Sequence, residues 1–498
     1  MSIKSIFNLN IQLRDALIHY PSFVSKSFKP KKMKKSILAL SLAGALMFSS
    51  CESEVTVDQS TLQSIVDQAV AAALANYPSS EAIATAAREA ATAAVAAGFA
   101  GQETVDVEAA IAAALAASEA LTNPPVQRVG SGGITTITAS TTWTNDKIWL
   151  MDGKVVVEDG ATLTVEAGTI VKGAKGTGAN ATVLIVAKGG KINAVGTADK
   201  PIIFTDVDDN IVYANGSTSP NRSLRDKGLW GSVILLGKGT TGAAGGVANI
   251  EGVVSGYTFT QYGGSTPADS SGEMQYVSIR HTGTAVSPGN ELQGLTMGGV
   301  GSGTVIENIE LFGSEDDGIE IFGGSVDVTN LVVAYQDDDA IDLDQAYDGT
   351  ISNAAVFMGS GSDTVFEIDG TEDPAGAIVG SYTLTGVTAY GNGDAVKTAV
   401  FGDWKSDATG FNENILYVDF KTGSTIKGID ADTYDGAGTA AATGKLNYKD
   451  IVVVSTDTKA AILNGKATEA SATWLTVAAA RPSTGGADES VFAWTQLY

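Results

Sequence analysis

The pattern of apolar and polar positions repeats at a fixed interval between Thr304 and Asp369. An asparagine recurs after 22 and again after 23 residues, and an acidic motif lies between these marks at the same spacing. A period this short predicts stacked repeats, each of which buries its apolar face against its neighbours. The repeated segments are Asn308-Ile309, Asn330-Leu331 and Asn353-Ala354, and then Asp317–Glu320, Asp339–Asp342, Asp363–Phe366 and Asp394–Lys397.

Within each repeat, apolar and acidic residues alternate as they do along a β-strand. Ile319, Ile321, Ile341 and Leu343 are expected to point inward, and Glu320, Asp342 and Asp344 outward. Short β-rich runs separated by glycine and aspartate turns continue over residues 135–498, and no helical crossovers separate them. The pattern predicts a mainly β chain folded as a parallel β-helix, a solenoid in which Asn308, Asn330 and Asn353 stack at one turn.

Five segments resemble Bacteroidetes envelope proteins that have a pectin-lyase-like right-handed β-helix. They are Trp143–Asp146, Gly160–Val165, Leu229–Gly237, Gly298–Thr304 and Asp316–Gly324. The resemblance covers Thr135 to Tyr498 and implies a right-handed parallel β-helix in the cell envelope. That family has no assigned reaction, so the resemblance carries over no catalytic residues.

An alanine-rich segment precedes the β-helix. Residues 59–122 show apolar positions at helical spacing, interrupted at Pro78 and Gly101. Alanine favours helices but offers little area to bury, so these helices would pack closely, against each other or against another chain. Two interpretations stay open, a stalk that self-associates and a helical linker without a partner. Residues 123–134 are expected to be a linker with a flexible joint at Gly130–Gly133.

The N-terminal region has the features of a targeting signal. Residues 1–50 contain a basic run and the apolar stretch Ile37–Phe48, which is too short to span a bilayer, and Met33 is the expected true start. Cys51 after small residues resembles a bacterial lipoprotein cleavage site, which implies lipidation of Cys51 and a tether over residues 51–58. We expect an outer-membrane lipid anchor and a protein that faces the cell exterior. The alternative is an ordinary signal peptide with an incidental cysteine.

Composition narrows the chemistry. The chain has 498 residues, 58 glycines and a net charge of -25, and this acidic balance argues against nucleic acid as a partner. One cysteine excludes an intrachain disulfide and a cysteine-based zinc cluster. The only histidines are His19 and His281, which excludes multi-histidine metal sites and most histidine-based triads. We expect His281 to be structural or at the surface.

The concentrated chemistry is a ladder of carboxylates on the repeat. Glu320 and Asp342 would lie about 4.8 Å apart on neighbouring strands, and such crowding requires water, shared protons or a cation. Clustered carboxylate oxygens suit Ca²⁺, whereas the alternative is a solvated acidic face that keeps the solenoid soluble. The predicted calcium ligands are Asp316, Asp317, Glu320, Asp338, Asp339, Asp342 and Asp344.

Two function classes remain. The first is a binding or structural module, with calcium and a polysaccharide or another cell-surface molecule as partners. The second is a polysaccharide lyase or glycoside hydrolase, with Asp317, Asp339, Lys397 and Arg280 as candidate catalytic residues. The polygalacturonase branch of the fold also carries Gly-His-Gly and Arg-Ile-Lys segments, and neither occurs in this sequence.

Three further patterns carry less chemistry. The acidic strings Asp206–Asn210 and Asp430–Gly436 lack the glycine and glutamate spacing of an EF-hand, so they are interpreted as polar loops. Aromatic residues offer a sugar platform only where they face outward. Val491–Trp494 is apolar enough to cap the last coil.

Overall fold

The computed structural model describes residues 122–498, apart from 254–255, 285–291, 374–379, 392–399 and 430–445. The predicted signal region, the tether with Cys51 and nearly all of the alanine-rich segment therefore lie outside the described residues. None of the helices in the described part is long and apolar enough to cross a membrane.

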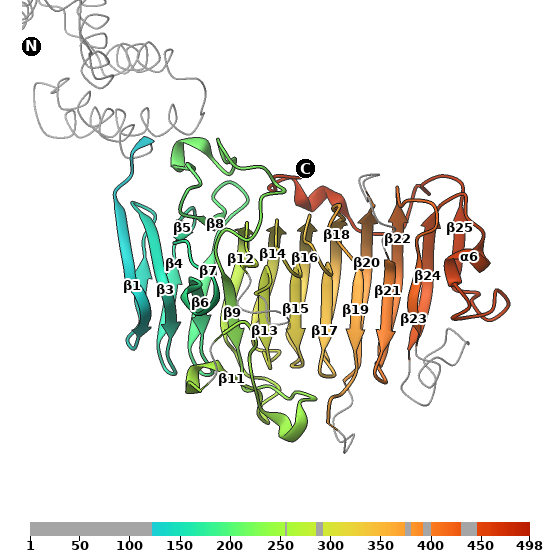
Figure 1. The fold of residues 1–498 in the computed structure, drawn as a ribbon, viewed down its shortest axis with the longest axis horizontal. Helices are drawn as coiled ribbons and strands as arrows, with labels where there is room; N and C mark the ends of the chain where they lie inside the picture. Colours follow the sequence, from blue (N-terminus) through green and yellow to red (C-terminus); the bar gives the residue numbers. More distant parts are fainter. Residues whose placement is uncertain (1–121, 254–255, 285–291, 374–379, 392–399, 430–445) are drawn as a thin grey trace, which may run out of the picture. The chain divides into compact units, whose positions relative to one another are not determined.

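The described chain is a right-handed parallel β-helix, as the repeat and the resemblance predicted (Figure 1). Its 23-stranded sheet is parallel at every strand pairing, and β10 (Ala248–Asn249) and β11 (Gln261–Tyr262) form a separate antiparallel pair. The strands of the large sheet up to residue 280 are β1 (Val126–Ile137), β2 (Thr141–Trp143), β3 (Ile148–Val157), β4 (Thr162–Val165), β5 (Ile170–Gly173), β6 (Val183–Val186), β7 (Lys191–Val195), β8 (Ile202–Asp206), β9 (Ser232–Leu236) and β12 (Gly272–Arg280).

From β12 onward each coil contains one long strand and one short strand. The long strands are β14 (Val305–Phe312), β16 (Asp327–Ala334), β18 (Thr350–Phe357), β20 (Tyr382–Tyr390), β22 (Gly410–Val418) and β24 (Asn447–Val454). The short strands are β13 (Leu295–Gly298), β15 (Ile319–Phe322), β17 (Ile341–Asp344), β19 (Phe366–Asp369), β21 (Val400–Lys405), β23 (Thr425–Ile429) and β25 (Leu475–Ala478). The helical turns are η2 (Gly178–Asn180), η3 (Tyr213–Asn215), η4 (Ala244–Gly246), η5 (Thr258–Thr260), α6 (Lys459–Leu463) and η6 (Glu489–Phe492).

Each long strand bends at one residue that adopts a left-handed conformation. Asn308, Asn330 and Asn353 have φ values of 55°, 58° and 56°, and the parallel pairing skips each of them. The amide of Asn330 donates to Asn308 Oδ1 over 3.0 Å, and the amide of Asn353 donates to Asn330 Oδ1 over 2.7 Å. Asparagine tolerates this conformation better than most residues. The predicted stacking of these three residues is confirmed.

The interior of the coils is apolar. Ile319, Ile321, Ile341 and Leu343 belong to one continuous core and are at most 1 % exposed. Burying one such side chain stabilises the fold by about 1.5–3 kcal/mol. The predicted alternation is therefore confirmed for the inward positions.

The expected linker over residues 123–134 is wrong from Val126 onward. β1 starts at Val126 and pairs in parallel with β3, with a shift of register between Gly130 and Ile134. A Cβ atom on Gly130 would lie 2.3 Å from the carbonyl oxygen of Asp152. The glycines thus allow two backbones to approach closely in the first coil, and they are not a flexible joint.

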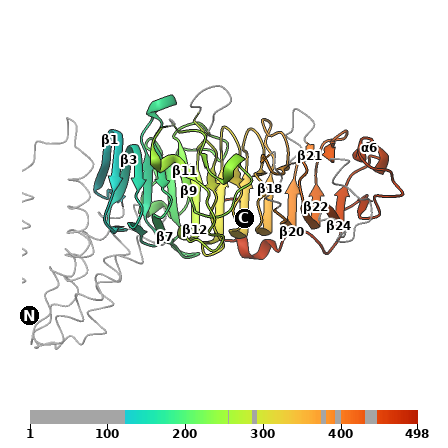
Figure 2. The same cartoon turned by 90° about the horizontal axis from the view of Figure 1, so that it is seen from below.

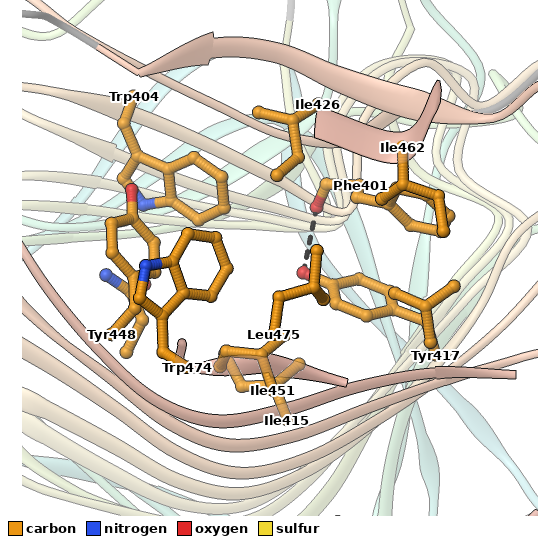
Figure 3. Close-up of a pocket in the computed structure, with 12 residues that line it drawn as sticks. Phe401, Trp404, Ile415, Tyr417, Ile426, Tyr448, Ile451, Ile462, Trp474 and Leu475 are labelled. Carbon is orange, nitrogen blue, oxygen red and sulfur yellow. Dashed lines mark hydrogen bonds between the residues drawn. The ribbon is translucent and has the colours of Figure 1, made fainter. Parts of the chain in front are cut away.

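The predicted cap is also wrong. α6 packs on β23 and β25, and its buried residues Ile462 and Leu463 join the core at the last coils. Figure 3 shows this end of the interior, where Tyr448 stacks on Trp474 and the hydroxyl of Tyr417 donates to the carbonyl of Phe401 over 3.1 Å. Val491–Trp494 instead returns along the outside of the long strands, and Figures 1 and 2 place the C-terminal segment beside β12–β18.

Candidate functional site

A column of carboxylates runs along the outer side of the short strands. β15, β17, β19 and β21 pair in parallel and in register, so Glu320 lies opposite Asp342, followed by Glu367 and Asp403. β13 precedes them and has Thr296 at this position. The sequence repeat correctly predicted that Glu320 and Asp342 are neighbours, because a constant coil length keeps equivalent residues in register.

A second set of carboxylates lies in the turns before these strands. They are Asp316 and Asp317 before β15, Asp338 and Asp339 before β17, and Asp363 before β19. The backbone N–H of Asp339 donates to Asp317 Oδ1 over 2.8 Å, and the N–H of Thr364 donates to Asp339 Oδ1 over 2.6 Å. Each of these two carboxylates therefore binds the backbone of the next coil, which fixes its position at the end of the column.

Several of these carboxylates are buried although they point away from the core. Glu320, Asp317 and Asp339 are 5 %, 6 % and 4 % exposed. Gln293, which lies between β12 and β13, donates to Glu251 Oε1 over 2.7 Å and to Asp316 Oδ2 over 3.3 Å. Chain inserted between β9 and β13 thus lies against this part of the column. The alternative of a solvated acidic face is wrong for the three buried residues.

Three carboxylates converge under this cover. Asp317, Glu320 and Asp342 each offer an oxygen, and these oxygens all lie within 4.8 Å of one another. Two buried oxygens, Glu320 Oε2 and Asp342 Oδ1, have no hydrogen-bond partner. Two unit charges at this distance repel by about 3–4 kcal/mol at an effective dielectric constant near 20. Three ionised carboxylates therefore need bound protons or a cation at this place.

The pKa shifts of these carboxylates indicate the same need for bound protons or a cation. Burial, and then the neighbouring carboxylates, raise the pKa of Asp317, Glu320 and Asp342 well above their usual values. Burial also raises the pKa of Asp339 to about 9 and that of Asp344 to about 7. Without a cation, this part of the column holds protons at neutral pH.

Lysines compensate the other end of the column. Lys405 forms ion pairs with Glu367 and, over 3.1 Å, with Asp369, and Lys427 lies 3.3 Å from Asp403. Burial opposes ionisation of Glu367, but its hydrogen bonds with Asp339 and Lys405 outweigh that effect and lower its pKa. The column is thus charge-compensated at β19–β21. Among the described residues, no lysine or arginine is one of the largest influences on the pKa of Asp317, Glu320 or Asp342.

The donor set suits a hard divalent cation. Ca²⁺ takes six to eight oxygen ligands, and carboxylates bind it through one oxygen or both. Asp317, Glu320 and Asp342 would be its direct ligands, and two of these residues each have a buried oxygen without a hydrogen-bond partner. Of the other predicted ligands, Asp316 and Asp338 form a group with Asp317, and Asp338 and Asp339 form a group with Asp363. Asp344 occupies the next outward position of β17, and its pKa is raised by burial first and then by Asp369 and Glu372.

Two of the candidate catalytic residues, Arg280 and Lys397, are not among the described residues of the carboxylate column. Arg280 is fully buried on β12, where its guanidinium donates to Ser278 Oγ over 2.7 Å and to the Ser217 carbonyl over 2.6 Å and pairs with Glu310. β12 belongs to the long-strand side, where Arg280 is bound to Ser278 and Glu310 and not to the carboxylate column. Lys397 lies outside the described residues.

Other predicted features are structural. His281 is buried, and its Nδ1 lies 2.7 Å from the carbonyl oxygen of Asp226. Asp206 of the first EF-hand-like string is bound by Arg222, and the second string lies outside the described residues. The aromatic side chains of Trp143, Trp230, Tyr347 and Trp404 are buried, so they offer no sugar platform.

The segments that contain Glu251 and Gln293 and lie against the carboxylate column were not predicted from the sequence. They lie outside the repeat, and their only signal is the longer spacing between the strands of residues 232–298.

Comparison with known proteins gives one match. A family described as a pectate-lyase-like β-helix domain matches residues 135–498, which contain every carboxylate of the column. No curated protein and no solved structure matches the chain.

Proposed function

Because the chain belongs to the family of pectate-lyase-like β-helix domains, we propose that it is a calcium-dependent binding module. Ca²⁺ would be held by Asp317, Glu320 and Asp342 and would fix the segments that cover β13 and β15. The observation that carries the proposal is the convergence of three carboxylates, of which Asp317 and Glu320 are buried, together with two buried oxygens, Glu320 Oε2 and Asp342 Oδ1, that have no hydrogen-bond partner.

The cation would act on shape as well as on charge. The carboxylate of Glu251 influences Glu320, and Gln293 connects Glu251 to Asp316. A bound cation replaces repulsion among these groups by attraction and so holds the covering segments on the strands. The partly exposed carboxylates of Asp342 and Asp344 border this place. The proposed ligand of this surface is a glycan or another cell-surface molecule.

The proposed location is the outer membrane, with the β-helix facing the cell exterior. The apolar stretch Ile37–Phe48 and the following Cys51 support a lipid anchor. Millimolar calcium outside the cell matches the weak affinity of extracellular calcium modules, which is on the order of 0.1–1 mM.

The second candidate is a polysaccharide lyase or glycoside hydrolase. The observation in its favour is the position of Lys405 beside the carboxylates of Glu367 and Asp369. Asp317 and Asp339 would be its acid and base. It predicts new absorbance from an unsaturated product, or new reducing ends, when the protein is incubated with acidic polysaccharides and calcium. Either signal, lost on Asp339→Asn, would replace binding by catalysis as the function.

The test of calcium binding is thermal unfolding of the purified protein with chelator and with millimolar calcium. We expect calcium to raise the melting temperature, and the triple variant Asp317→Asn, Glu320→Gln, Asp342→Asn to lose the shift. Asp159→Asn, at an exposed carboxylate on another coil, is the matched control and should keep the shift. An unchanged melting temperature of the parent protein would remove the proposal.

A further inference from the structure

The column of left-handed residues continues past the asparagine ladder. The parallel pairing aligns seven such residues, one in each long strand. They are Tyr276, Asn308, Asn330, Asn353, Gly386, Asn414 and Asp450. Gly386 has no side chain, so the ladder of side-chain amides is interrupted between Asn353 and Asn414.

The backbone of residues 486–488 fills this interruption. The N–H of Asp488 donates to Asn353 Oδ1 over 2.6 Å, and Asn353 Nδ2 donates to the carbonyl of Asp488 over 3.3 Å. The N–H of Gly486 donates to Asn414 Oδ1 over 2.9 Å, and Asn414 Nδ2 donates to its carbonyl over 3.2 Å. Both asparagines thus bind the returning chain as they would bind the next amide of the ladder.

The following residues extend over earlier coils. Phe492 is fully buried against Val332 of β16 and Ala355 of β18. Trp494 packs edge-on against Tyr276 of β12, with ring centroids 5.5 Å apart. We call residues 486–498 the strap, and it crosses the strands from β22 to β12.

The far end of the strap closes over a buried ion pair. The N–H of Gln496 donates to Glu310 Oε1 over 2.6 Å, while Glu310 pairs with the fully buried Arg280. The side-chain amide of Gln496 also donates to the carbonyl of Ser217. Removal of the strap would admit water to this pair.

The segment before the strap has the properties of a hinge. Residues 479–481 and 483–485 are exposed, and Gly485 and Gly486 have φ values of 100° and 78°. Two successive residues with φ values in this region are readily tolerated only when both are glycine. The strap is therefore joined to the last coil by a short connection that can change direction.

We propose that the strap is a clamp, hinged at Gly485–Gly486, that couples the coils from β12 to β22 so that they open together only when it is released. In a solenoid each repeat contacts only its neighbours, so coils can open one by one. A segment bound to long strands of six coils, from β12 to β22, adds contacts between distant repeats. The clamp thereby makes local opening of these coils depend on one event.

Hydrogen exchange of the full chain, read by mass spectrometry of its peptides, tests the proposal. Phe492→Ala should release the strap and speed exchange roughly tenfold or more, both in the strap and in β14, β16 and β18. Exchange in β3–β6 should be unchanged. Val491→Ala, at an exposed position of the same segment, is the control and should leave all of these rates unchanged.

A second variant releases the strap without removing core volume. Asparagine tolerates the left-handed conformation of Gly386, and its amide would complete the ladder and compete with residues 486–488. Gly386→Asn is expected to reproduce the exchange pattern of Phe492→Ala. If exchange rises in the strap alone in either folded variant, or if neither variant changes exchange anywhere, the clamp is refuted.

Discussion

Glu320 occupies an outward position of a strand and is nevertheless buried, and this combination gives the carboxylate column its chemistry. The alternation Ile319-Glu320-Ile321 fixes the direction of its side chain. The carboxylate of Glu251 influences Glu320, and Gln293 donates to Glu251; both residues come from segments outside the repeat. Direction is a local property of a strand, whereas burial depends on chain that is distant in sequence.

Asp339 gives a prediction for pH in protein freed of metal by a chelator. Burial raises the pKa of Asp339 to about 9, against about 3.9 in an unfolded chain. Between these values the folded state binds more protons, so this group's stabilisation is lost as the pH rises towards 9. We expect the free energy of unfolding to fall by about 1 kcal/mol per pH unit between pH 7 and 9.

The variant Asp339→Asn isolates this effect. Asparagine resembles the protonated acid, since it accepts the N–H of Thr364 and can donate to Glu367. Urea unfolding at pH 7, 8 and 9 should show a flatter dependence for Asp339→Asn than for the parent protein or Asp159→Asn. The same slope in all three proteins would show that Asp339 does not hold its proton in the folded state.

At the scale of elements, the asparagine ladder sets the bend of the long strands. Asn330 accepts an amide from Asn353 and donates one to Asn308 while holding a φ of 58°. Asn330→Ala loses both hydrogen bonds, about 0.5–1.5 kcal/mol each, and adds about 1–2 kcal/mol of backbone strain. Asn330→Gly loses the bonds without the strain.

We therefore expect Asn330→Ala to destabilise the protein more than Asn330→Gly, which itself destabilises it relative to the parent. Urea unfolding followed by circular dichroism measures the order. An alanine variant as stable as the glycine variant would mean that backbone strain at the bend has no energetic weight.

The sequence was sufficient to predict the elements that repeat and insufficient for those that occur once. The interval of 22 residues predicted the coils, the inward isoleucines and the register of Glu320 with Asp342. The prediction of a flexible joint at Gly130–Gly133 was wrong. Glycine is typical of flexible chain, but it is also required where two backbones approach closely, as β1 and β3 do here. The cap was wrong because Phe492 finds an apolar surface on the outside of β16 and β18.

At the scale of the whole molecule, the long sheet presents many carboxylates at regular spacing, and few cations compensate them near β15 and β17. The net charge of -25 follows from the composition, but the composition does not show that carboxylates gather at one place on the sheet. The family match supports the fold over residues 135–498. The proposed lipid anchor and the proposed calcium site are inferred from residues of this chain and not from the family match.

The anchor gives a prediction for cells that express the full chain. Cys51→Ala removes the proposed lipid attachment, so we expect the protein to leave the membrane fraction and appear in the soluble fraction. Ser53→Ala, in the proposed tether, is the control and should remain with membranes. Continued membrane association of Cys51→Ala would show that Cys51 is not the anchor.

The most direct test of the calcium site is a calorimetric titration of chelator-treated protein with CaCl₂ at pH 8. We predict saturable binding with a Kd on the order of 0.1–1 mM, together with proton release that is seen when buffers of different ionisation enthalpy are compared. The triple variant Asp317→Asn, Glu320→Gln, Asp342→Asn should show no saturable heat. Absence of binding to the parent protein, or equal binding to the triple variant, would contradict the account.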